Sequence, residues 1–165
     1  MYGTEIIKSE FNKVKNKSKK YNLNLKNIYN KDFFDFYKSN KDKVKFDLII
    51  GNPPFIRYQN YPLKMRENAN KLLLQKEIKT NKLTNIWVHF LLLSSLMLND
   101  KGKIGFVIPS ELFQVKYAKI VRNFLLKNFK KINIVSFKKL SFEGIQQDVI
   151  ILLCEKLNDN SVGIL

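Results

Sequence analysis

Runs of apolar residues alternate with amphipathic and polar segments along the chain, and this pattern predicts strands and helices in turn. The clearest strand is residues 45–50 (KFDLII), an unbroken apolar run closed by Gly51 and two prolines. Such a run is typical of a strand buried on both faces. Shorter β-rich runs predict five further strands, at residues 2–7, 25–29, 103–108, 131–137 and 148–155.

Helices are predicted where apolar residues recur three or four positions apart. Thr84 or Asn85 can cap the most regular of them, and Ser110 stands where it can cap the next. A turn is expected at residues 100–102. The predicted helices cover residues 8–20, 83–99 and 111–128, with a further one near residues 63–78 in a largely polar segment.

Strands that alternate with helices indicate an α/β fold, with a parallel sheet covered by helices on both faces. The last two predicted strands have no helix between them, so one of them is expected to be antiparallel. With 165 residues, the chain is long enough for one domain and short for two. We therefore treat residues 1–165 as a single domain.

The charge balance points to a polyanionic partner. The chain has 30 Lys and Arg against 14 Asp and Glu, which gives a formal net charge of +16. Such an excess favours nucleic acid, although a general preference for Lys and Asn would also raise the charge.

One cysteine, Cys154, and one histidine, His89, exclude an internal disulfide and a metal site built from His and Cys. We expect no metal, with both residues in the core. The longest apolar stretch, residues 86–98, is shorter than the roughly 20 residues of a membrane helix. No secretory signal is recognisable. The sequence therefore predicts a cytoplasmic protein without a membrane partner.

The candidate chemistry lies at the end of the clearest strand, in Asn52-Pro53-Pro54-Phe55. In open α/β sheets, ligands bind beyond the carboxyl ends of the strands. Two prolines stiffen this loop and remove two N–H donors. The acceptors that remain are the Asn52 side-chain oxygen and the Pro53 carbonyl, beside the aromatic face of Phe55.

Two acceptors and a flat apolar surface suit a planar ring that carries an amino group, such as adenine. The lone pair of that amine is delocalised into the ring. Acceptors that hold both N–H bonds localise the lone pair, so that the nitrogen can attack a sulfonium methyl group. Positioning and electrostatics supply most of the effect, without a strong base.

The chain resembles the amino-group adenine-specific DNA methyltransferases of bacterial restriction–modification systems. Asn52-Pro53-Pro54-Phe55 is similar to the family's most diagnostic motif, with Phe55 where Tyr is commoner. The resemblance implies a Rossmann-like fold that uses S-adenosyl-L-methionine and acts on DNA, with Asn52, Pro53, Pro54 and Phe55 as catalytic residues. Asn52 would also contact the cofactor.

The other motifs imply further site residues. Residues 2–6 (YGTEI) resemble the second motif, so Glu5 would bind the cofactor ribose and Ile6 its adenine. Ile7 stands where the family has an aspartate. In residues 29–36, which resemble the third motif, Asp32 would accept from the cofactor's adenine amino group and Phe33 would pack on its ring.

Later segments complete the resemblance. Residues 85–87 and 101–113 are similar to the fifth and sixth motifs, and residues 141–156 to the eighth. Phe142 in that last segment would stack, together with Phe55, on a target base rotated out of the duplex.

The family's first strand and its Gly-rich turn have no counterpart in the chain, and neither does its target-recognition domain. We therefore expect a partial catalytic domain that lacks the first strand and is compromised when alone. A second chain could supply the missing parts. The sequence leaves open a protein-glutamine or ribosomal-RNA amino methyltransferase, and a non-catalytic remnant or partner subunit that binds DNA or another methyltransferase chain.

Overall fold

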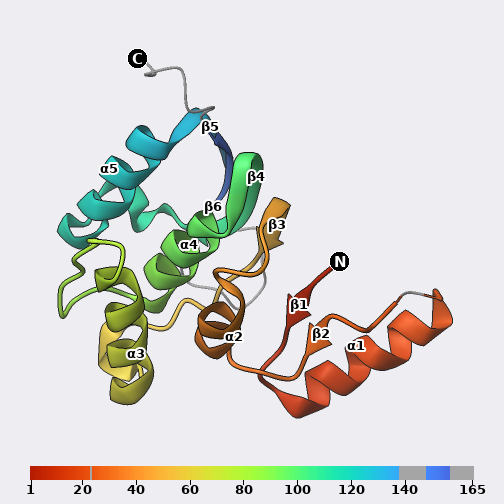
Figure 1. Cartoon of the computed structure of the whole chain (residues 1–165). Helices are drawn as coiled ribbons and strands as arrows, with labels where there is room; N and C mark the ends of the chain where they lie inside the picture. The colour runs from red at the N-terminus through yellow and green to blue at the C-terminus, as the bar shows by residue number, and fades with distance from the viewer. Residues whose placement is uncertain (23, 138–147, 157–165) are drawn as a thin grey trace. The chain divides into compact units, whose positions relative to one another are not determined.

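The computed structural model describes residues 1–22, 24–137 and 148–156 (Figure 1). The chain divides into two compact units, Met1–Asp42 and Lys43–Leu165. Of the candidate cofactor residues, Glu5, Ile6, Asp32 and Phe33 lie in the first unit, whereas Asn52 lies in the second with the rest of the Asn-Pro-Pro-Phe segment.

The first unit is built on a two-stranded parallel sheet. Strand β1 (Gly3–Thr4) pairs with β2 (Ile28–Tyr29), and helix α1 (Lys8–Lys20) connects them. Both strands are shorter than the sequence pattern predicts, whereas α1 has the predicted bounds. Helix α2 (Phe33–Asn40) follows and was not predicted.

Helix α2 supplies most of the core of the first unit. Phe34, Phe36 and Tyr37 are buried on it. The ring of Tyr29 lies 5.6 Å from that of Phe36, and the ring of Tyr2 lies 6.5 Å from it. An aromatic cluster of this kind buries much apolar area in a small unit.

The second unit has a four-stranded sheet in the order β3-β4-β6-β5. Strands β3 and β4 are parallel, while β6 runs antiparallel to both of its neighbours. The expected antiparallel strand is therefore β6, and the mixed α/β class is confirmed. The strands are β3 (Phe46–Gly51), β4 (Leu98–Pro109), β5 (Phe129–Ser136) and β6 (Val149–Lys156).

The helices of the second unit depart from the predictions at their ends. Ser110 caps no helix: it begins a 3₁₀ turn, Ser110–Phe113. A second 3₁₀ turn, Lys116–Ala118, precedes α5 (Lys119–Asn128), so the predicted helix over residues 111–128 is broken into three pieces. The remaining helices are a 3₁₀ turn at Tyr58–Asn60, α3 (Leu63–Leu74) and α4 (Ile86–Leu96).

Helix α4 is the core of the second unit. Ile86, Trp87, Val88 and Leu93 are buried on it, and at about 100° per residue they are spread around the helix. A helix that is apolar all round must be enclosed. Helix α4 packs against α3, α5 and strand β4, and it holds the middle of this unit (Figure 1).

Strand β4 begins at Leu98, inside the segment predicted to be helical. Its register against β3 shifts between the pairs Phe46–Leu98 and Leu48–Lys103. The predicted turn at residues 100–102 is therefore an irregularity within the strand, where three residues of β4 have no counterpart on β3.

The expectation that residues 45–50 form a strand buried on both faces is wrong. Strand β3 lies at the edge of its sheet, and Leu48 and Ile50 are 61% and 75% exposed. Ile104, Phe106 and Leu152 are buried on the opposite face of the sheet. The elements that pack on a sheet decide which of its faces are covered, and the sequence of one strand does not contain that information.

Among the described residues, no helix is long and apolar enough to cross a membrane.

Candidate functional site

The Asn-Pro-Pro-Phe segment leaves the carboxyl end of β3, as predicted. Strand β4 runs parallel to β3 and ends at Pro109, so the loops after both strands leave the same edge of the sheet. At Gly51, the last residue of β3, the backbone passes close to the ring of Phe106, because a Cβ at this position would lie 3.1 Å from that ring. The segment therefore begins where backbone and core are in close contact.

The four residues of this segment differ in exposure. Asn52 and Pro54 are exposed, Phe55 is half-buried and Pro53 is buried. Within the described part of the chain, no donor reaches the Asn52 side chain or the Pro53 carbonyl. The acceptor of the exposed Asn52 side chain is therefore available to a ligand, whereas Pro53 is buried.

Asn85 holds the loop that follows. The backbone N–H of Tyr58 donates to Oδ1 of Asn85 at 2.8 Å, and the N–H of Ile86 donates to the Ile56 carbonyl at 3.3 Å. Asn85 occupies the N-cap position of α4, but its side chain makes no capping bond. It instead fixes the chain a few residues after Phe55.

Glu111 completes a buried polar network around Asn85. Its Oε1 accepts from Nδ2 of Asn85 at 3.0 Å, from Nε1 of Trp87 at 2.9 Å and from the hydroxyl of Tyr117. Nδ2 of Asn85 also donates to the Tyr117 oxygen at 2.7 Å. Burial, followed by the hydrogen bond to Glu111, raises the pKa of Tyr117.

Sequence reasoning placed Asn85, Trp87 and Glu111 within motifs but assigned them no role in the site. The available signal was that Asn85 and Glu111 stand next to apolar segments, and that Trp87 has a polar N–H inside one. A buried polar group must find a partner, but the sequence does not tell which one.

In the first unit, Glu5 follows β1 directly, and its N–H donates to the Tyr29 carbonyl at 3.0 Å. Its Oε1 accepts from the N–H of Ile7 at 2.7 Å. Ile6 is 56% exposed. Glu5 and Ile6 thus lie at the carboxyl end of a parallel strand, where ligands of such sheets bind.

Asp32 is the N-cap of α2. Its Oδ1 accepts from the N–H groups of Phe34 at 2.7 Å and Asp35 at 3.3 Å, while its pKa is raised by burial, against the lowering effect of those two bonds. Phe33 is half-buried, and its ring lies 5.6 Å from that of Phe34. One carboxylate oxygen of Asp32 thus holds the helix, and Oδ2 is left for another donor.

Phe142 lies outside the described residues. His89 is fully buried and shares a 2.7 Å hydrogen bond, through Nε2, with Oδ1 of Asn70, and burial raises the pKa of Cys154 to about 12. Both residues belong to the core, as expected. No group of three His, Cys, Asp or Glu gathers as a metal site in the ranges that the structure covers.

The fold is that of a class I methyltransferase. A solved structure of a class I S-adenosylmethionine-dependent methyltransferase from Listeria monocytogenes superposes with a TM-score of 0.74 at 18% identity, over 97% of this chain and 45% of that one. A type I restriction–modification methyltransferase subunit from Streptococcus thermophilus also gives 0.74 at 18% identity, over 96% and 34%. These neighbours support the prediction of S-adenosyl-L-methionine as cofactor.

The chain belongs to the Eco57I restriction-modification methylase family, whose model matches residues 2–142. Type II methyltransferase M.AccI from Acinetobacter calcoaceticus is 36% identical over 132 residues, which are 75% of this chain and 23% of that protein. M.HincII from Haemophilus influenzae is 31% identical over 126 residues, 75% of this chain and 24% of that protein. The chain thus spans about a quarter of the length of these curated relatives.

Proposed function

We propose that the chain is the catalytic core of an adenine-specific DNA methyltransferase, which transfers a methyl group to the exocyclic amino group of a base rotated out of the duplex. One observation carries the proposal. Asn52 is exposed at the carboxyl end of β3 with its acceptor unused, while Asn85 anchors the chain immediately beyond it.

The chemistry follows from this geometry. The Asn52 oxygen and the Pro53 carbonyl each accept one N–H of the target amine, so the nitrogen lone pair is no longer shared with the ring. Acceptors that are fixed in place stabilise the developing charge without reorganisation. Phe55, with Phe142, would hold the ring by stacking.

S-adenosyl-L-methionine supplies, when bound, a methyl group carried on a positively charged sulfur. The residues of the first unit fit such a cofactor. Glu5 lies at a strand end with one carboxylate oxygen left for a ribose hydroxyl, and Asp32 keeps Oδ2 for the adenine amino group. Ile6 and Phe33 offer apolar surface for the adenine ring.

We further propose that a second polypeptide supplies a strand to the edge of β3, and that methyl transfer is weak without it. Among the described strands, β3 pairs on one side only, with β4, and this open edge supports the proposal, because the backbone N–H and C=O groups of an edge strand are a site for pairing with another chain. Titration calorimetry with S-adenosyl-L-methionine provides the test. Micromolar binding by the chain with no partner would contradict this second proposal and leave the first intact.

The decisive experiment is a methyl-transfer assay on DNA, ribosomal RNA and a protein release factor with the native protein and labelled S-adenosyl-L-methionine. Label in N6-methyladenine of DNA, lost in Asn52→Ala, is expected. Transfer to RNA or to a glutamine side chain would show that the proposed DNA substrate is wrong. No transfer to any of the three, even with the partner chain present, would favour a non-catalytic role.

A further inference from the structure

A pocket of about 330 Å³ in the second unit lies apart from the Asn-Pro-Pro-Phe segment in sequence and is rich in lysine. The loop between α3 and α4 forms one wall, and the start of α5 with the 3₁₀ turn before it forms the other. Its lining includes Lys79, Asn81, Lys116, Tyr117, Lys119 and Asn123. No carboxylate lines it.

The three lysines carry charge that nothing in the described chain neutralises. Lys79, Lys116 and Lys119 are exposed. None of these three lysines forms an ion pair within the part of the chain that the structure describes. Helix α5 begins in the same wall with no side-chain cap on its first N–H groups, so the partial positive charge of its N-terminus adds to the lysines.

Both walls of the pocket are held in place. On one side, Oδ1 of Asn81 accepts from the N–H of Leu83 at 2.9 Å, and Oγ1 of Thr80 donates to Asn70 at 2.6 Å. On the other, Tyr117 is fixed by Asn85 and Glu111. The pocket is thus formed before a ligand arrives, which lowers the entropic cost of binding.

We infer that this pocket binds a backbone phosphate of the nucleic acid, with Lys79, Lys116 and Lys119 as the contacting charges. Three cations and two amide side chains around a space of this size suit a phosphodiester, whereas a neutral or cationic ligand would leave the lysines unpaired. Lysine contacts a phosphate as a point charge and carries no base code. This contact would position the duplex and leave its sequence unread.

A chain of hydrogen bonds connects the pocket to the loop that follows Asn52-Pro53-Pro54-Phe55. Tyr117 lines the pocket and bonds Asn85, and Asn85 accepts from the N–H of Tyr58. A phosphate held beside Tyr117 would therefore be fixed relative to the segment that carries Asn52. The inference rests on the proposed nucleic-acid substrate, but it is tested by binding rather than by methyl transfer, so either can fail alone.

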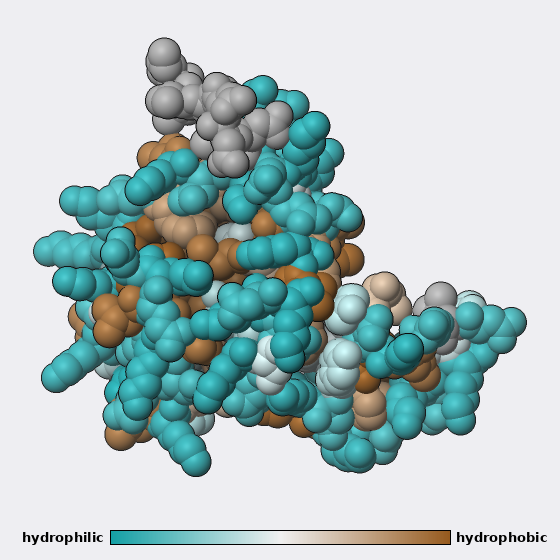
Figure 2. All heavy atoms as spheres, viewed as in Figure 1, coloured by the Kyte–Doolittle hydropathy of each residue, from teal (hydrophilic) through white to brown (hydrophobic). Residues whose placement is uncertain are grey.

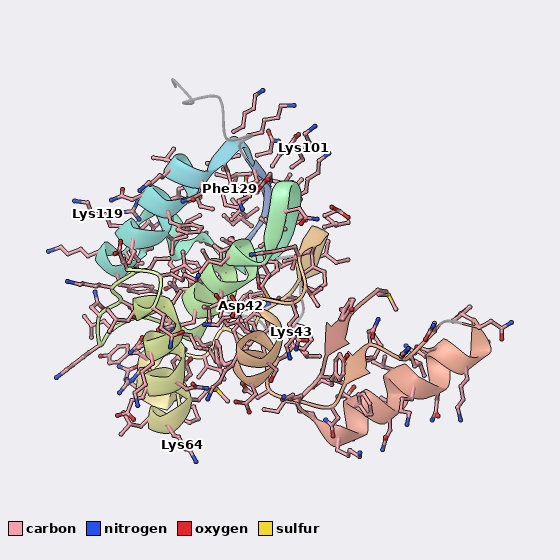
Figure 3. The ribbon with its side chains drawn as sticks, in the orientation of Figure 1. Asp42, Lys43, Lys64, Lys101, Lys119 and Phe129 are labelled. Carbon is pink, nitrogen blue, oxygen red and sulfur yellow. The ribbon has the colours of Figure 1, made fainter. Side chains whose placement is uncertain are left out.

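The test compares two triple variants of equal charge in the native protein. Lys79, Lys116 and Lys119 are replaced by Gln in one, and the exposed Lys101, Lys127 and Lys130 in the control. Lys119 and Lys101 lie on opposite sides of the second unit (Figure 3). Figure 2 shows that hydrophilic side chains cover much of the visible face of this unit, so a charge-matched control is essential.

Affinity for a short fluorescent DNA duplex is measured between about 50 and 200 mM salt. The pocket variant should lose about tenfold in affinity, and its plot of log affinity against log salt should be shallower by about 1 to 2. The control should stay within about threefold of the wild type. Equal losses in both variants would overturn the inference, and so would no loss in either.

Lysine acetylation of the wild-type protein gives a second readout that no folding defect can disturb. DNA should protect Lys79, Lys116 and Lys119 more than Lys101, Lys127 and Lys130. Equal protection would contradict the assignment. If inorganic phosphate protects the pocket lysines as well as DNA does at the same phosphate concentration, the pocket is a free-phosphate site and the inference fails.

Discussion

The backbone N–H of Tyr58 donates a 2.8 Å hydrogen bond to Oδ1 of Asn85, 27 positions further along the chain. The bond ties the loop after Asn52-Pro53-Pro54-Phe55 to the first turn of α4, the most buried helix of the second unit. The loop is therefore fixed to a largely buried helix, as a site built on a rigid element requires.

Replacing Asn85 should loosen this attachment. Asn85→Ala leaves the Tyr58 N–H without its acceptor and removes one donor to Glu111, which should lower the free energy of unfolding by about 1–3 kcal/mol. Urea titration measures the loss. Asn99→Ala removes an exposed hydrogen bond to Asp47 and serves as the control, with a change near zero. Equal effects in the two variants would show that the network adds no special stability.

Asn52→Ala should abolish turnover and leave DNA affinity unchanged. Removing one positioned polar group from a transition state typically costs about 2.7–4 kcal/mol, or 10² to 10³ in rate. Because Asn52 is exposed and makes no bond within the described chain, the stability of the variant should match that of the wild type. Asn60→Ala, at another exposed position, is the control. Turnover within threefold of the wild type would refute the proposed role.

Phe55→Ala should weaken the hold on a base outside the duplex, since stacking contributes roughly 1–3 kcal/mol per base. DNA with 2-aminopurine at the target position reports the change, because that base fluoresces strongly once it is unstacked. The wild type should give the brighter signal. Equal brightness in both proteins would contradict the assignment of Phe55.

His89 should make stability depend on pH. Burial lowers its pKa to about 4 from an ordinary 6.5, so below pH 6.5 the unfolded chain takes up a proton that the folded protein excludes. Titration of His89 therefore leaves the free energy of unfolding unchanged above about pH 6.5. As the pH drops from 6.5 towards 4, the free energy of unfolding decreases, by about 3 kcal/mol in all.

Urea titrations at several pH values measure this dependence. His89→Gln can still donate to Asn70 and has no ionisable ring, so its stability should vary less over the same range. A variant with the wild-type pH dependence would show that other groups are responsible.

The edge of β3 should promote self-association. Ile50 is 75% exposed there, and a charged residue on an edge strand disfavours pairing with another chain. Ile50→Lys should reduce light scattering at high protein concentration. Leu63→Lys adds the same charge at a 59% exposed position on α3 and should have little effect. A larger reduction with Leu63→Lys would contradict the importance of the edge.

Local patterns in the sequence were enough to predict several elements of this fold and the position of the Asn-Pro-Pro-Phe segment. The Asn-Pro-Pro-Phe segment was placed correctly at the end of a strand, because an apolar run closed by Gly51 and prolines has few other local conformations. Helix α1 was predicted with its observed bounds, and the expectation of no helix between the last two predicted strands led to an antiparallel pair, which the structure has. Each of these features depends on neighbours in sequence.

Tertiary structure alone decided the rest. The break before α5 was missed, and β3 was expected to be buried on both faces although Leu48 and Ile50 are exposed on one of them. Helix α2 was missed too, but there the N-cap Asp32 is a signal that the sequence does contain. Thr84 or Asn85 was expected to cap α4; Asn85 does occupy the N-cap position, but its side chain joins Tyr58, Glu111 and Tyr117. The lysine pocket likewise joins residues 79–81 to residues 116–123. A polar side chain can find its hydrogen-bond partner, and an apolar face its cover, at several places in a fold. Only the packing of segments that are distant in sequence selects one of them.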